Sequence, residues 1–132
     1  MTFESKQISE RIERPLGEVY AYASDPAHLP EWASGLGTGV TEEGGTWWVE
    51  TGSGRLGLEF APHNDYGVLD HNVILPTGEV VYNPLRVVAN AEGSEIVFTL
   101  RRTPDMTDED FDRDAALVQA DLTRLKQLLE SA

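Results

Sequence analysis

The sequence predicts an α+β fold in which about seven antiparallel strands wrap around one long C-terminal helix. The start of the chain combines a strand pattern with two short helix signals. From Val40 to Arg102, short β-type runs alternate with turn motifs such as PTGE and AEGS. An apolar stripe at helical spacing then covers the last part of the chain. Because 132 residues suit one domain, we expect a single domain over residues 1–132.

The first strand is expected at Phe3–Glu13, where Ile8 and Ile12 belong to one alternating face. Pro15 follows, and proline is tolerated in the first turn of a helix because the N–H that it lacks has no partner there. Apolar residues after it repeat at helical spacing. A short helix is therefore predicted directly after the first strand.

A second short helix is predicted at the pair Asp25–Pro26, which combines a helix-capping side chain with a proline in the first turn. This helix would carry Leu29 and Trp32 toward the body of the protein. Three glycines between positions 35 and 39 end it. We expect Trp32 to close one end of any internal cavity and the glycine segment after it to be mobile.

The last helix is predicted over Asp108–Glu130. Thr107 is a suitable N-cap, and the acidic first turn lies at the positive end of the helix dipole. At 1.5 Å per residue the helix would be about 35 Å long, enough to cross a small sheet. The stripe would also suit a coiled coil of about three heptads, but packing on the sheet is favoured. Its members are Phe111, Ala115, Val118, Leu122, Leu125 and Leu129.

The charge of the chain argues against nucleic acid as a partner. The sequence has 10 lysines and arginines against 23 acidic residues, a formal net charge of −13, which repels phosphates and anionic lipid headgroups. Without cysteine there are no disulfides, thiolate metal sites or cysteine nucleophiles. The charged N-terminus MTFESKQISE is unlike a signal peptide. We therefore expect a cytoplasmic protein without membrane insertion, as a monomer or weak homodimer.

Three segments resemble parts of a known family: IERPLGEVYAYASDPAHLPEW, GVLDHNVILPTGEVVYNPLRVV, and FTLRR with the later DLTRLKQLLE. Together they resemble the START-like helix-grip superfamily (SRPBCC), in its polyketide cyclase and dehydrase-like branch. The resemblance covers essentially the whole chain and implies an apolar cavity between the sheet and the C-terminal helix. The superfamily includes lipid and sterol carriers, plant hormone receptors, polyketide cyclases and relatives of the Hsp90 activator. Membership alone therefore does not choose a function.

His71 is the candidate chemical group of this expected cavity. In the predicted strand Val68–Leu75 it shares the apolar face, whereas Asp70 and Asn72 share the other. A histidine there could act as a general acid or base, because its pKa lies near neutral. It could equally be a core histidine bonded to a backbone carbonyl. Both interpretations stay open.

A metal site would need at least three converging ligands, and the cluster worth testing is His63, Asp65, Asp70 and His71. Alternation along the strand sends Asp70 and His71 to opposite faces. We therefore expect no metal and no cofactor.

Two features of the predicted sheet bear on the cavity. Trp47 and Trp48 are adjacent, so one of them faces inward, and the sequence does not say which. Pro84 interrupts ladder pairing, so a bulge is expected near Tyr82 that could turn a polar side chain inward.

The favoured hypothesis is a non-enzymatic protein that binds a small, largely apolar molecule, lipid-like or polyketide-like, in the internal cavity. A second hypothesis is a cyclase- or dehydratase-type enzyme in which His71 and Tyr82 move protons. A third is a protein-interaction module resembling the Hsp90 activator relatives, which would need an exposed apolar patch. The expected ligand-binding residues are Trp32, Phe60, His71, Tyr82, Phe98 and Val118.

Overall fold

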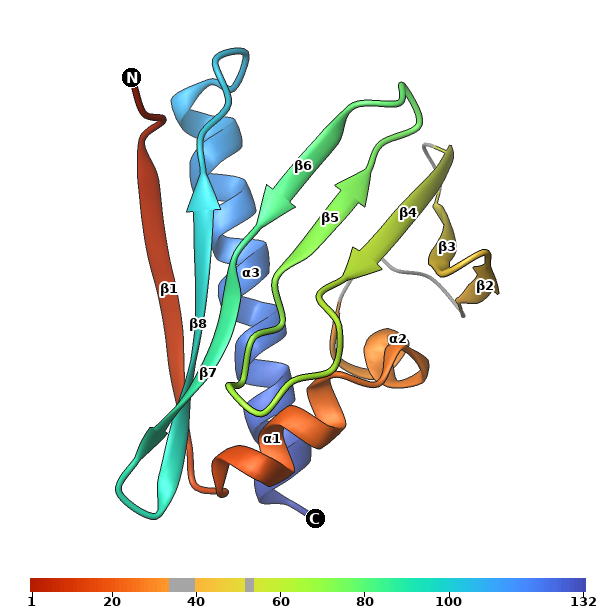
Figure 1. Cartoon of the computed structure of the whole chain (residues 1–132). Helices are drawn as coiled ribbons and strands as arrows, with labels where there is room; N and C mark the ends of the chain where they lie inside the picture. The colour runs from red at the N-terminus through yellow and green to blue at the C-terminus, as the bar shows by residue number, and fades with distance from the viewer. Residues whose placement is uncertain (34–39, 52–53) are drawn as a thin grey trace.

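The structure is a computed structural model that describes residues 1–33, 40–51 and 54–132 (Figure 1). As predicted, it is an α+β fold with a sheet wall and a long C-terminal helix. In chain order the elements are β1 (Ser5–Ile12), α1 (Leu16–Ala23), η1 (Pro26–His28), α2 (Leu29–Trp32), β2 (Thr41–Glu43), β3 (Thr46–Thr51), β4 (Gly54–Phe60), β5 (His71–Ile74), β6 (Val80–Asn83), β7 (Leu85–Asn90), β8 (Gly93–Arg101) and α3 (Asp108–Glu130).

The described strands form two antiparallel sheets, so the expectation of one seven-stranded sheet was wrong. One sheet has the order β1-β8-β7 and the other has the order β2-β3-β4-β5-β6. The division falls at Pro84, between β6 and β7. Proline has no N–H to donate to a ladder, so β6 pairs with β5 while β7 pairs with β8.

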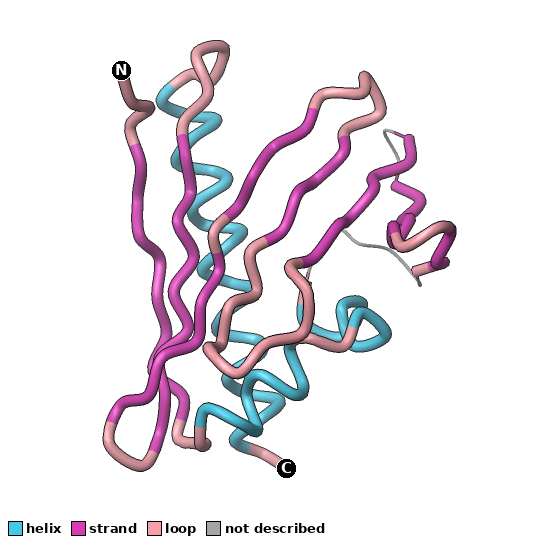
Figure 2. The backbone as a smooth tube through the Cα atoms, in the orientation of Figure 1, coloured by secondary structure: helices cyan, strands magenta, loops and turns pink. Residues whose placement is uncertain are grey.

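Backbone contacts of the 67–69 segment join the two sheets. The N–H of Leu69 donates to the carbonyl of Leu85 at 2.8 Å, and the N–H of Val87 donates to the carbonyl of Gly67 at 2.9 Å. Gly67 has φ 73°, and a Cβ built on it would lie 2.2 Å from the Val87 carbonyl oxygen. Only glycine fits this position. The strands of the two sheets therefore follow one another as one wall (Figure 2).

α3 begins and ends as the sequence predicts and lies behind the wall in the view of Figure 1. Its N-terminus is a capping box in which Thr107 and Asp110 bond each other's backbone N–H groups, at 3.0 and 3.1 Å. Phe111, Leu122, Leu125 and Leu129 are buried in the core. The middle of the predicted stripe, Ala115 and Val118, is partly buried. The helix therefore packs tightly near its two ends and less tightly in the middle.

α2 lies beside the C-terminal half of α3, and α1 packs against β7 and β8 (Figure 1). The Asp25 side chain caps η1 by accepting from the N–H of Ala27 at 3.0 Å, as predicted. Arg124 Nε of α3 donates to the carbonyl of Glu31 at 3.3 Å and ties the helices together. Trp32, at the end of α2, is only 7% exposed.

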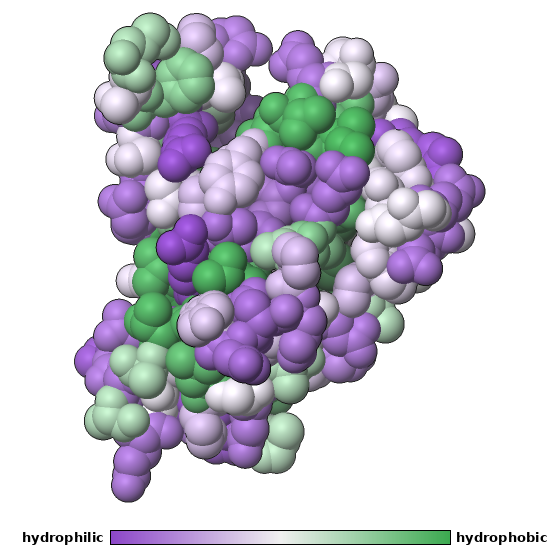
Figure 3. Space-filling view, in the orientation of Figure 1, coloured by the Kyte–Doolittle hydropathy of each residue, from purple (hydrophilic) through white to green (hydrophobic). Residues whose placement is uncertain are grey.

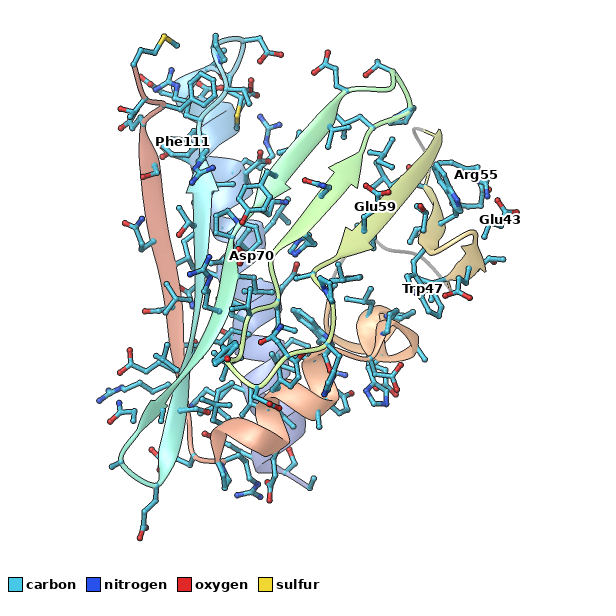
Figure 4. The ribbon with its side chains drawn as sticks, viewed as in Figure 1. Glu43, Trp47, Arg55, Glu59, Asp70 and Phe111 are labelled. Carbon is cyan, nitrogen blue, oxygen red and sulfur yellow. The ribbon has the colours of Figure 1, made fainter. Side chains whose placement is uncertain are left out.

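The pairing of β3 with β4 shows which of the two adjacent tryptophans faces inward. Trp47 pairs with Leu58 and packs against the core, so it faces inward. Trp48 pairs with Gly57 on the other face, where the Arg55 guanidinium lies 4.5 Å from the centre of its ring. Figure 4 labels Trp47 and Arg55 on this part of the sheet. Within the described part of the chain, no helix has both the length and the apolar character of a membrane span.

Candidate functional site

A cavity of about 200 Å³ lies between the sheet wall and α3 and is the candidate functional site. Five of the six expected residues line it: Trp32, Phe60, His71, Phe98 and Val118. They come from α2, β4, β5, β8 and α3, so the cavity exists only once the whole domain has folded. The side chains from β4 and β5 reach it because alternate residues of a strand share one face.

Among the residues that the structure describes, the rest of the lining is apolar apart from one acidic residue. Leucine, valine and alanine side chains from the sheet and the helices form most of it. Asp121 of α3, which is not a member of the predicted apolar stripe, lies among them. The signal that could have located it is its spacing, because residues three apart on a helix are neighbours and Asp121 follows Val118 by three.

The cavity places His71 between two aromatic rings. Its ring centre lies 5.4 Å from that of Phe60 and 6.2 Å from that of Phe98. Nδ1 lies 3.0 Å from the carbonyl oxygen of Leu69. A carbonyl can only accept, so Nδ1 carries the proton and, in the neutral ring, Nε2 is a bare acceptor. Burial lowers the pKa of His71, against smaller raising effects of this hydrogen bond and of Asp70, and favours the neutral ring.

This shift predicts that acid weakens the fold through His71. A lowered pKa means that the unfolded chain takes up a proton below about pH 6.5 before the folded chain does. The contribution of His71 to stability is therefore complete above that pH and declines as the pH falls below it. We expect the nitrogen shifts of His71, followed by NMR, to titrate with a midpoint below about 6.5. His71→Gln should remove this part of the pH dependence of unfolding, and an unchanged dependence would contradict the assignment.

Tyr82 is not in the cavity lining, which corrects its expected place. β5 and β6 pair regularly, with His71 opposite Asn83 and Asn72 opposite Tyr82. Since His71 faces inward, Asn72 and Tyr82 share the outer face. Pro84 ends the strand but does not turn Tyr82 inward, and 44% of Tyr82 is exposed. The second polar group that the enzyme hypothesis assigned to the cavity is therefore outside it.

On the outer face, Tyr82 belongs to a cluster around Asp70, which Figure 4 labels where β6 passes into β7. The Tyr82 hydroxyl donates to the Asp70 carboxylate. Arg86 donates from Nε and Nη2 to the same carboxylate at 3.1 and 2.8 Å, and the Leu85 N–H donates at 2.9 Å. Bonds from Arg86 above all, then from Tyr82 and Leu85, lower the pKa of Asp70 to about 2 against the opposing effect of burial.

The four residues weighed as a metal cluster do not converge. His63 lies against Tyr20, with Nδ1 3.4 Å from the hydroxyl, and Asp65 is exposed in the loop. Asp70 is held by Arg86 on the outer face, and His71 lines the cavity. Across the described ranges, no group of three or more histidine, aspartate or glutamate side chains is placed to share a metal ion.

Trp32 lies at the end of the cavity that the short helices cover. Its Nε1 is buried and has no hydrogen-bond partner among the residues that the structure describes. The three glycines expected to form a mobile segment after it fall at 34–39, outside the described residues.

An open groove of about 600 Å³ continues from the cavity toward the N-terminal half of α3. The two spaces share Leu56, Val73, Phe98 and Val118. Figure 3 shows the surface notched between the start of α3 and the β5–β6 hairpin, with apolar atoms beside the notch. On the helix side the groove is lined by residues between Asp110 and Val118 of α3.

No family model matches the sequence, and no curated protein matches it. Solved structures do match over nearly the whole chain. DynU16, a protein of the dynemicin biosynthetic locus, has a TM-score of 0.73 and 19% identity over 96% of this chain and 47% of its own. The chain therefore spans about half the length of DynU16. CV1439 from Chromobacterium violaceum has a TM-score of 0.75 and 17% identity over 96% of this chain and 97% of its own.

CalU16 from Micromonospora echinospora has a TM-score of 0.69 and 16% identity over 95% of this chain and 73% of its own. The likeness is one of fold. It agrees with the helix-grip arrangement that the sequence resemblance implies, and at these identities it carries no activity.

Proposed function

We propose that the protein binds a small, largely apolar molecule in the cavity between the sheet wall and α3. The observation that carries the proposal is the cavity itself, whose described lining is almost wholly apolar and comes from seven separate elements. A close-packed core normally leaves few voids larger than a water molecule. A preformed apolar cavity with a few polar groups is the usual form of a small-molecule site.

The size of the cavity limits what its inner end can hold. An engineered apolar cavity of about 150 Å³ in another protein binds benzene, so about 200 Å³ suits one ring or two fused rings. A longer ligand would extend through the four shared residues into the groove. A polyketide-like molecule has this shape, and the likeness to a protein of a biosynthetic locus supports that class.

The other hypotheses have less support. The exposed large apolar side chains of the described residues are spread over the N-terminus, β6, β7, α3 and the loop before β5, whereas an interaction module needs a continuous patch. Asp121 and His71 line the same cavity, and this observation favours an acid–base enzyme. Proton transfer by His71 would require a substrate carbonyl or hydroxyl within hydrogen-bond reach of Nε2.

Val118→Trp tests the proposal because it places an indole inside the cavity. We expect naphthalene to bind the unchanged protein saturably in calorimetry or NMR titration, and the variant to bind it at least about tenfold more weakly. A filled cavity has no space for the probe, and each tenfold is about 1.4 kcal/mol. The variant should still fold, because the new ring enters existing space.

Ala120→Trp is the matched control, since it introduces the same side chain at an exposed position of the same helix. It should bind naphthalene like the unchanged protein. Equal binding by both variants would place the probe elsewhere and refute the cavity as the site. If the unchanged protein instead converts a bound carbonyl compound, and His71→Gln slows conversion about 100-fold with binding intact, the enzyme hypothesis is correct.

A further inference from the structure

His71, which lines the cavity, has one ring nitrogen that no described residue occupies. Nδ1 of His71 donates to the Leu69 carbonyl, which leaves Nε2 of the neutral ring with a lone pair and no proton. Within the described part of the chain, no hydrogen bond to Nε2 is formed. Nε2 is not one of the fully buried polar atoms that lack a hydrogen-bond partner, so part of its surface is accessible. The ring that carries it lines the cavity.

An apolar ligand that covered Nε2 without bonding to it would carry an energetic penalty. A buried acceptor that loses water and gains no partner costs free energy comparable to a lost hydrogen bond. A ligand with a hydroxyl or N–H at the same place avoids that penalty. The flanking rings of Phe60 and Phe98 supply the apolar surroundings in which the difference is largest.

The charges of the lining oppose an anionic group at this position. The described lining contains one acidic side chain, Asp121, and no lysine or arginine. A carboxylate or phosphate would lose its hydration there without gaining a cation, and a bare Nε2 offers it no proton. The whole chain adds to this effect, because its formal net charge is −13.

We propose, on the basis of the proposed binding function, that the site selects neutral apolar ligands bearing a hydroxyl or N–H that donates to His71 Nε2, and rejects carboxylates. The ligand class is therefore an aromatic or alicyclic alcohol, phenol or amide rather than a fatty acid or another apolar acid. Discrimination of this kind arises because a site built around a hydrogen bond penalises the analogue that cannot form it.

Four probes of one ring system test the proposal: naphthalene, 2-naphthol, 2-methoxynaphthalene and 2-naphthoate. The informative quantity is the dissociation constant of 2-methoxynaphthalene divided by that of 2-naphthol, because both carry an oxygen and only the naphthol can donate. We expect this ratio to be about tenfold larger in the unchanged protein than in His71→Leu, the size of a net hydrogen bond. We expect 2-naphthoate to bind at least about tenfold more weakly than naphthalene.

A second measurement needs no variant. On the unchanged protein, saturating 2-naphthol should move the NMR shift of His71 Nε2, and saturating 2-methoxynaphthalene should leave it much closer to its free value. This result would support the proposal even if His71→Leu did not fold.

The possible failures can be told apart. If naphthalene binds but the ratio is the same with and without His71, the inference is wrong and the binding function stands. Binding of 2-naphthoate as tight as that of naphthalene overturns the charge argument. If none of the four probes binds, both the binding function and this inference are refuted for a ligand of this size.

Discussion

Leu125→Ala is expected to lower the free energy of unfolding by about 3–5 kcal/mol, the range found for buried leucines in well-packed cores. Leu125 is 0% exposed and lies on the face of α3 that the sheet wall covers. It is not part of the cavity lining, so the space left by the deletion would be new. Surrounding side chains relax only partly around such a space, which adds to the lost burial of the side chain.

Chemical denaturation of both proteins measures this loss. Leu117→Ala is the matched control, because Leu117 lies on the same helix and is 51% exposed. It should change stability by less than about 0.5 kcal/mol. If the two variants unfold at the same denaturant concentration, α3 does not pack on the wall through this face.

Asp70→Asn is expected to lower the free energy of unfolding by about 2–3 kcal/mol at neutral pH. The carboxylate receives hydrogen bonds from the Leu85 backbone, from Arg86 and from Tyr82, at the place where the two sheets meet. Removing one partner of a fully buried ion pair can cost about 3–5 kcal/mol. The Arg86 side chain is 53% exposed, so water would solvate its charge and the smaller figure is expected.

Asp70→Asn should also change how the free energy of unfolding depends on pH. The carboxyl has a pKa of about 2 in the folded protein and about 3.9 when unfolded, so its contribution is complete above about pH 4. It is lost as the pH falls from about 4 toward 2, and the stabilities of the two proteins should converge over that range. Asp65→Asn, an exposed residue of the preceding loop, is the control and should follow the unchanged protein. Curves that never converge would show that Asp70 does not stabilise the fold through its charge.

Elements with local signals were predicted well. The bounds of α3 and its Thr107 cap follow from residues within one or two turns of each other, so no distant contact is needed to place them. The inward direction of His71 follows from alternation along one strand. The same rule explains why Asp70 lies on the opposite face.

Predictions that depend on distant pairing failed. The sheet was expected to be continuous, but whether β6 and β7 share a ladder depends on β5 and β8, which come from different parts of the chain. Tyr82 was expected in the cavity because Pro84 indicated a bulge, yet regular pairing with Asn72 keeps it outside. Asp121 was not among the expected lining residues, because its place in the cavity depends on how far the middle of α3 lies from the sheet wall.

The sequence by itself determined the α+β class, the long C-terminal helix and the apolar face that carries His71, because short-range periodicity and caps act within single elements. Only the tertiary structure decided the division of the sheet, the outward place of Tyr82 and the presence of Asp121 in the lining. It also decided which ring nitrogen of His71 is left bare, through the Leu69 carbonyl. A cavity is space that surrounding elements leave unfilled, so its polar groups are set by how those elements pack and not by any one of them.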